Sequence, residues 1–330
     1  MYLKFNRFEK QILIFSFICL IAFINFGYSG LKFPIQMHKS LDHDAWVYLT
    51  MVQDGVMSVN DFRSSRVLSP FLGYIITLIN NFFGFTNLPQ LNLLIVNSIF
   101  FGLAVLVFGF YLQLLKQETF FIVSIFILTI NFATVNYLAQ SLVEAAEVFF
   151  YMLLLYTLKK KRYYFIPIIF LFGSLNKILF VVGGGSLLVY HQLNILIKNP
   201  SQITFFKFIF QNIITAILIL VPFLIIKFQL YSGLETTFDV IDRHQQYVPN
   251  FNNAHGFLYV HILFLPIGLY GLWKKNRKLF YVCLSIMFPV LIFGVLIGAD
   301  PVSWGRYIFS ASCFPLSLGC AYVLFNWNSN

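Results

Sequence analysis

The sequence predicts an all-α polytopic membrane protein with about ten transmembrane helices, plus a juxtamembrane or re-entrant helix on the outer side. Hydrophobic residues make up 59% of the 330-residue chain and charged residues only 10%, whereas soluble domains are about half apolar and a quarter charged. Apolar runs of about 20 residues recur along the chain, and each can cross roughly 30 Å of hydrocarbon. These runs are continuous, whereas the strands of an outer-membrane barrel alternate. Residues 1–330 are therefore predicted to form a single integral membrane domain.

The first apolar run, residues 11–28, follows a basic N-terminus. The run is long and no small-residue cleavage site follows it, so we expect an uncleaved first span rather than a signal peptide. Positive charge marks cytoplasmic loops, so the N-terminus is expected in the cytoplasm and residues 30–66 outside. The net charge of +10 gathers in similar short gaps, at residues 159–162 and 274–278, and does not indicate nucleic-acid binding.

The later apolar runs follow one another with short gaps. They are residues 67–83, 91–115, 119–137, 142–158, 163–176, 178–197, 208–230, 257–273, 279–298 and 307–325. The N-terminus and residues 159–162 are both expected in the cytoplasm, yet an odd number of runs lies between them, so one run does not cross. Residues 67–83 form a short run with Pro70 near its start, and we predict that this run is the outer-side helix. Residues 231–256 then form a second external loop.

The acidic residues gather on the predicted outer side. Ten of the twelve lie at or near that face: Asp42, Asp44, Asp54, Asp61, Glu144, Glu147, Glu235, Asp239, Asp242 and Asp300. Acids hardly determine topology, so this clustering indicates chemistry on one side of the membrane.

The first external loop offers candidate acid and anion-binding residues. Asp44 and Tyr48 are four apart and share a face if the segment is helical, and a carboxylate at a membrane surface can act as a general base. The alternative is a solvated loop acid. Arg63 and Arg66 are three apart and could bind one phosphate with their guanidinium groups, or they could anchor the chain at the interface.

Charged residues also interrupt the later apolar runs. Glu144 and Glu147 begin the run 142–158, where they either face a wet cavity or cap a helix N-terminus. Lys177 follows a short run and needs a partner below the outer surface, unless it snorkels to water. The last span opens with Asp300 and Arg306. This pair either holds a phosphate, with the acid orienting the arginine, or anchors the helix at the interface.

No metal motif accompanies these residues. The cysteines (Cys19, Cys283, Cys313 and Cys320) lie in apolar runs without CxxC spacing, and His191, His255 and His261 are scattered. The glycines at 183–185 lack a following Lys-Ser/Thr and are expected to pack helices, not to bind phosphate. The sequence therefore predicts no certain cofactor, although a divalent metal ion stays open.

Four of these features together resemble the GT-C glycosyltransferase superfamily, which includes the protein O-mannosyltransferases and the aminoarabinose transferases of lipid A. The first is an acidic first external loop with Asp42, Asp44 and Tyr48. The second is a basic-then-proline segment, residues 66–70, that leads into an outer-side helix. The third is a cation within a middle span, Lys177, and the fourth is an arginine that opens a late span, Arg306.

The resemblance implies a polyprenyl-phosphate sugar donor supplied from the membrane lipids and a glycan, lipid or protein acceptor. A hexosyl or pentosyl group would be transferred at the outer face of a cytoplasmic membrane. The first-loop acid would orient or deprotonate the acceptor hydroxyl, and Arg66, Lys177 and Arg306 would form one cationic pocket for the departing phosphate. Asp42 and Asp44 flank a histidine, so which acid matches the family stays open. The chain is expected to lack the C-terminal soluble domain of many relatives.

Two other functions stay open, a transporter or flippase of lipid-linked or anionic solutes and a polysaccharide polymerase. A transporter places its charges near the midplane and binds from both sides, whereas these acids gather at one face, which favours an enzyme. Absence of an Asn-x-Ser/Thr acceptor site (x other than Pro) and of an ER-retrieval tail favours a bacterial membrane.

Overall fold

The computed structural model describes residues 6–32, 43–56, 58, 66–86, 88–131, 143–198, 263–296 and 301–327, together with part of 205–217. Of residues 23, 25–32, 43–46, 301–303 and 326–327 it describes the backbone alone. Every regular element in this part of the chain is a helix.

Most of the helices overlap the predicted apolar runs, whereas α3 lies in the predicted external loop 30–66. They are α1 (Arg7–Lys32), α3 (His43–Asp54), α4 (Leu68–Phe82), α5 (Pro89–Leu115), η2 (Glu118–Phe120), α6 (Phe121–Ile130), α7 (Glu144–Lys159), η4 (Tyr163–Phe165), α8 (Ile166–Asn176), α9 (Ile178–Lys198), α13 (Phe264–Lys275), α14 (Arg277–Leu296) and α15 (Pro301–Trp327). An all-helical architecture is therefore confirmed for the described residues.

Four of the described helices are long and apolar enough to cross a membrane: α5, α9, α14 and residues Trp304–Phe325 of α15. The predicted count of about ten spans is not shown, because several predicted runs form short helices. The helices α4, α6 and α8 have 15, 10 and 11 residues. Most of the run 208–230 lies outside the described residues.

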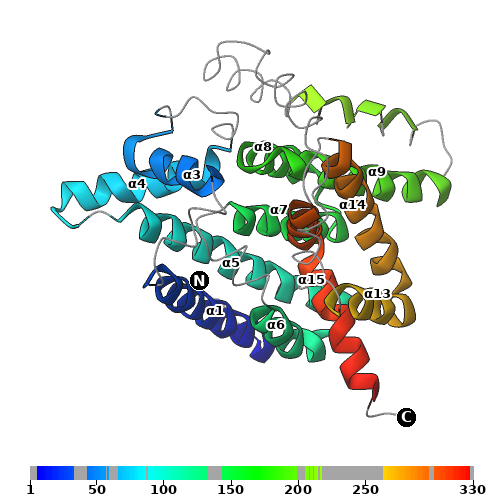
Figure 1. Ribbon diagram of the computed structural model, residues 1–330. Helices are drawn as coiled ribbons and strands as arrows, with labels where there is room; N and C mark the ends of the chain where they lie inside the picture. Colours follow the sequence, from blue (N-terminus) through cyan, green and yellow to red (C-terminus); the bar gives the residue numbers. More distant parts are fainter. Residues whose placement is uncertain are drawn as a thin grey trace.

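Helix α15 is central, and it packs against α6, α7, α13 and α14 (Figure 1). Glycines allow its closest approach, because a Cβ built on Gly271 of α13 would collide with the carbonyl oxygen of Gly319. The same holds in reverse for Gly319 and the carbonyl oxygen of Gly268. Small residues that bring two backbones together are typical of helix pairs in membranes.

One end of the bundle, which we call the basic end, holds the loops with the two basic clusters. The Tyr322 hydroxyl of α15 donates a hydrogen bond to Gln117 Oε1 in the loop before α6, and Tyr322 also bonds the side chain of Asn276 between α13 and α14. Tyr163, just after residues 159–162, lies 3.3 Å from Nε2 of His191 near the end of α9. Glu144 at the start of α7 contacts Arg306 near the start of α15, and both helices run from there toward these clusters, so the two clusters share an end, while the membrane side stays a prediction.

Helix α4 lies along the opposite end, which we call the site end. Near its start, the Ser69 hydroxyl donates to Asn176 Oδ1 at the end of α8 (2.8 Å). Near its end, Asn80 Nδ2 donates to Asn92 Oδ1 in the first turn of α5 (3.1 Å). The start of α4 therefore contacts the end of α8, its end contacts the first turn of α5, and its predicted place on the outer side stays a prediction.

Candidate functional site

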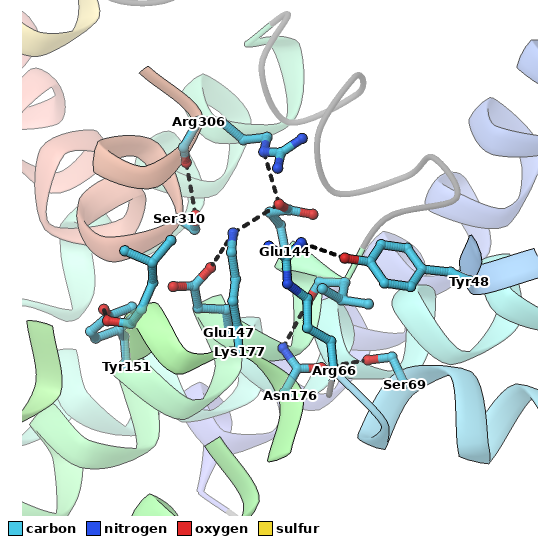
Figure 2. Close-up of polar contacts among 12 residues, drawn as sticks. Tyr48, Arg66, Ser69, Glu144, Glu147, Tyr151, Asn176, Lys177, Arg306 and Ser310 are labelled. Atoms are coloured by element: carbon cyan, nitrogen blue, oxygen red, sulfur yellow. Dashed lines mark hydrogen bonds and ion pairs between the residues drawn. The ribbon is translucent and has the colours of Figure 1, made fainter. Parts of the chain in front are cut away.

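The site end contains a buried group of charges on α7, α8–α9 and α15 (Figure 2). Glu144 and Glu147 form the first turn of α7, and both side chains are buried. Lys177 stands between α8 and α9 in an extended conformation, with φ −161° and ψ 130°, and its side chain is 0% exposed. This break between the two helices places Lys177 Nζ 2.9 Å from Glu144 Oε1 and 3.1 Å from Glu147 Oε2.

Arg306, from the start of α15, contacts the same carboxylate. Its Nε atom lies 3.0 Å from Glu144 Oε1, so one oxygen of Glu144 is shared by two cations. The next residue, Tyr307, turns its ring toward Lys177, with Nζ 4.8 Å from the ring centroid. A cation over a desolvated aromatic face gains further stabilisation, which helps to offset the cost of burying Lys177.

A third cation, Arg66, reaches this group from the segment before α4. Its guanidinium group donates a hydrogen bond to the Tyr48 hydroxyl of α3 and lies over the Tyr48 ring, with Cζ 5.9 Å from the centroid. Arg66 is also close enough to Glu144 to stabilise the charge of that carboxylate. Asp44 lies one helical turn before Tyr48 on α3, and only its backbone belongs to the described part of the structure.

An uncharged network holds these elements together. Asn176 Nδ2 donates to the backbone oxygen of Val143, immediately before α7 (2.9 Å), and Asn176 Oδ1 accepts from Ser69 of α4 (2.8 Å). One buried amide therefore ties the start of α4 to the start of α7 and the end of α8. Because Asn176 directly precedes Lys177, we infer that it fixes the direction of the Lys177 side chain.

The charged group lies about 24 Å from the basic end of the bundle, by the lengths of α7 and α15. Glu144 begins α7, whose 16 residues place it about 24 Å from the basic end at roughly 1.5 Å per residue. Arg306 precedes Tyr322 on α15 by an equal number of residues, hence by about the same 24 Å. This distance is shorter than the roughly 30 Å thickness of a hydrocarbon layer.

These side chains have the chemistry of an anion site with carboxylates beside it. Among the described side chains, three cations (Arg66, Lys177 and Arg306) gather with two carboxyl groups (Glu144 and Glu147). Glu144 Oε2 is buried and has no hydrogen-bond partner among the described residues. The described part of the chain contains no group of three His, Cys, Asp or Glu side chains that could hold a metal ion, and its four cysteines are buried and free.

The structure brings together six of the residues singled out from the sequence, namely Tyr48, Arg66, Glu144, Glu147, Lys177 and Arg306. Asp42, Arg63, Asp300 and the loop 231–256 lie outside the described residues. Sequence reasoning missed Ser69, Asn176 and Tyr307. A polar residue beside the lysine that breaks an apolar run was the available signal for Asn176.

Comparisons of the chain with protein-family models, with curated proteins and with solved structures find no match. The resemblance to GT-C enzymes therefore stays a hypothesis carried by the residues themselves. Function has to be argued from the chemistry of the site, because a helical membrane fold serves many functions.

Proposed function

We propose that the chain is a GT-C-type glycosyltransferase that moves a hexosyl or pentosyl group from a polyprenyl-phosphate donor to an acceptor at the outer membrane face. The observation that carries this proposal is that Arg66, Lys177 and Arg306, from three separate segments, surround Glu144. Charges are costly inside a membrane protein and are kept there mainly for function. Arginine and lysine side chains that converge in this way are suited to a phosphate ligand.

Each residue type has a role in this reaction. The acceptor hydroxyl oxygen bonds to the anomeric carbon of the sugar, while the bond between that carbon and the donor phosphate oxygen breaks. The electron pair of that bond leaves with polyprenyl phosphate, whose growing negative charge the three cations stabilise. The hydroxyl proton passes to a carboxylate, and we assign this role to Asp44 or Asp42. Asp44 shares α3 with Tyr48, which is itself bonded to Arg66.

The proposal includes an arrangement in the membrane. The N-terminus and the basic end face the cytoplasm, about ten segments cross the bilayer, and α4 lies along the outer side. The membrane is proposed to be a bacterial cytoplasmic membrane. The charges then lie just inside the outer boundary, at a depth that suits a lipid phosphate whose chain extends into the hydrocarbon.

A binding and turnover experiment tests this function. The purified protein in lipid nanodiscs is titrated with undecaprenyl phosphate, and with undecaprenol as the uncharged probe. We expect saturable binding of the phosphate alone, weakened about 10- to 100-fold by Arg306→Gln, because a charge-assisted hydrogen bond contributes about 1.5–3 kcal/mol. Lys159→Gln, at the basic end, is the control and should bind normally.

Turnover is read separately, as polyprenyl phosphate released from sugar-loaded membrane lipids. Equal binding of the alcohol and the phosphate, or no effect of Arg306→Gln, contradicts the phosphate site. Binding without any release of polyprenyl phosphate contradicts the transferase.

A transporter or flippase of lipid-linked or anionic solutes is the second candidate, and one observation favours it. Lys177, Glu144 and Glu147 are buried inside the bundle beside a break between two helices, and discontinuous helices with buried charges are typical of transporters. Reconstituted liposomes separate the two functions. A transporter moves an intact lipid-linked or anionic solute across the bilayer, whereas a transferase breaks the sugar–phosphate bond. A polysaccharide polymerase would instead lengthen a glycan chain.

A further inference from the structure

Glu144 stands where an anionic ligand of this site would have to bind. Its Oε1 atom contacts Lys177 Nζ at 2.9 Å and Arg306 Nε at 3.0 Å, and Arg66 also stabilises its charge. Figure 2 shows this carboxylate between the lysine and the arginine, which come from different elements. The same cations are the ones that a phosphate would contact.

We propose that Glu144 is a resident anion, and that a phosphate monoester binds by displacing its carboxylate from Lys177 and Arg306. This inference rests on the proposed function for the identity of the ligand, and it adds a competitor within the chain. It gives Glu144 a role opposite to that of a ligand-binding residue, because its charge opposes binding.

Two features make the displacement feasible. Lys177 also contacts Glu147 at 3.1 Å, so it keeps one carboxylate partner when Glu144 leaves. Glu144 is the first residue of α7, where backbone N–H groups of the first turn have no partner within the helix and favour a negative charge. The displaced carboxylate can therefore be stabilised by the backbone N–H groups of the first turn of α7. Its Oε2 atom already lacks a hydrogen-bond partner among the described residues.

A phosphate is the stronger ligand for this set of donors. A phosphate monoester presents three acceptor oxygens and a charge between one and two units, whereas the carboxylate presents two oxygens and one unit. Arginine in particular binds phosphate through two parallel hydrogen bonds. The exchange replaces a weaker anion with a stronger one, so it proceeds without leaving the cations unpaired in a low-dielectric site.

The proposal is tested by whether one substitution, Glu144→Gln, raises or lowers the affinity for a phosphate monoester. Affinity for farnesyl phosphate is measured in nanodiscs for the wild type, Glu144→Gln and Glu147→Gln. Both variants remove one negative charge beside Lys177, so Glu147→Gln controls for simple electrostatics. We expect Glu144→Gln to tighten binding about tenfold and Glu147→Gln to change it much less. Weaker or unchanged binding in Glu144→Gln overturns the proposal, and so does an equal gain in both variants.

A second readout needs no variant. In a structure of the wild-type protein with farnesyl phosphate, we expect the phosphate between Lys177 and Arg306 and the Glu144 carboxylate moved away from both. A bound phosphate with Glu144 still paired to both cations overturns the displacement. This measurement decides the question even when Glu144→Gln does not fold.

Inorganic phosphate and dodecyl phosphate separate the source of the ligand. If the wild-type protein binds farnesyl phosphate more tightly than either of these, the site recognises an isoprenoid lipid, as the proposed function requires. A gain in Glu144→Gln with equal wild-type affinities for all three supports the displacement and removes the support for an isoprenoid donor. Failure of the displacement and failure of the proposed function therefore give different results.

Discussion

Lys177 Nζ lies 2.9 Å from Oε1 of Glu144, although the two residues are 33 positions apart in the chain. Both side chains are buried, at 0% and 1% exposure. Their contact joins the break between α8 and α9 to the first residue of α7. The same carboxylate accepts Arg306, so this pair is the centre of the charged group.

Removal of Lys177 is expected to destabilise the fold. Lys177→Met leaves Glu147 without its only described ion-pair partner, and breaking a buried pair costs about 3–5 kcal/mol. Unfolding in mixed micelles measures this loss. The double variant Lys177→Met/Glu147→Met should recover most of it, because the buried carboxylate that remains, Glu144, keeps its contact with Arg306. A loss below about 1 kcal/mol would show that water reaches the pair.

Asn176 is expected to position the lysine. Asn176→Ala removes both hydrogen bonds of the amide, whereas Ser69→Ala removes only one, and each bond contributes about 1 kcal/mol. We expect Asn176→Ala to lower the free energy of unfolding more than Ser69→Ala. It should also weaken undecaprenyl phosphate binding, because the direction of Lys177 changes. Loss of stability with normal binding would make Asn176 a purely structural residue.

Much of this arrangement follows from the sequence, and the limits have physical causes. Run lengths and breaks gave the starts and ends of α5, α7, α8 and α9 to within a few residues, because hydrophobicity and Lys177 mark them directly. Arg66, Lys177 and Arg306 were expected to lie together, because the sequence places each of them at the predicted outer boundary of the membrane. The predicted depth of a residue along the bundle does not say which carboxylate each cation contacts, because that depends on how the helices pack around one another.

The number of membrane spans could not be predicted from the sequence for a similar reason, because some apolar runs form short helices. An apolar run of 163–176 suggests a crossing, yet α8 has 11 residues and ends at the buried Lys177. Hydrophobicity reports that a segment avoids water, but it does not separate a lipid-facing span from a helix buried among others. In the described residues, α7 is such a buried helix.

Close packing of α13 on α15 gives a stability prediction. Gly271→Ala places a methyl group against the Gly319 carbonyl, and overpacking costs about 1–3 kcal/mol. Gly185→Ala is the matched control, since a Cβ there has nothing within 4 Å and alanine favours a helix. Thermal unfolding in micelles should fall for the first variant and hold or rise for the second. Equal behaviour would contradict the close approach.

Labelling from outside the cell tests the orientation. Gln53 on α3 and Lys275 at the end of α13 are both exposed, and the four native cysteines are buried. An impermeant thiol reagent applied to intact cells should label Gln53→Cys and leave Lys275→Cys unlabelled until the cells are permeabilised. The reverse pattern would place the site end in the cytoplasm and contradict an active site on the outer face.

The catalytic acid is predicted to be Asp44. It lies on α3 one turn before Tyr48, and Tyr48 bonds Arg66, so the backbone places Asp44 beside the cationic group. Asp44→Asn keeps the shape of the side chain and removes its capacity to accept a proton. We expect turnover to fall about 10²–10⁴-fold, with undecaprenyl phosphate still bound and the protein still folded.

Two further variants locate the effect. Asp54→Asn removes the same charge from the other end of α3, where the side chain is exposed, and should leave turnover near normal. Asp42→Asn should cost much less than Asp44→Asn, because Asp42 precedes the helix. If Asp42→Asn abolishes transfer while Asp44→Asn does not, the acid has been assigned to the wrong residue. If neither variant slows transfer, the first loop does not hold the base, and another group must accept the hydroxyl proton.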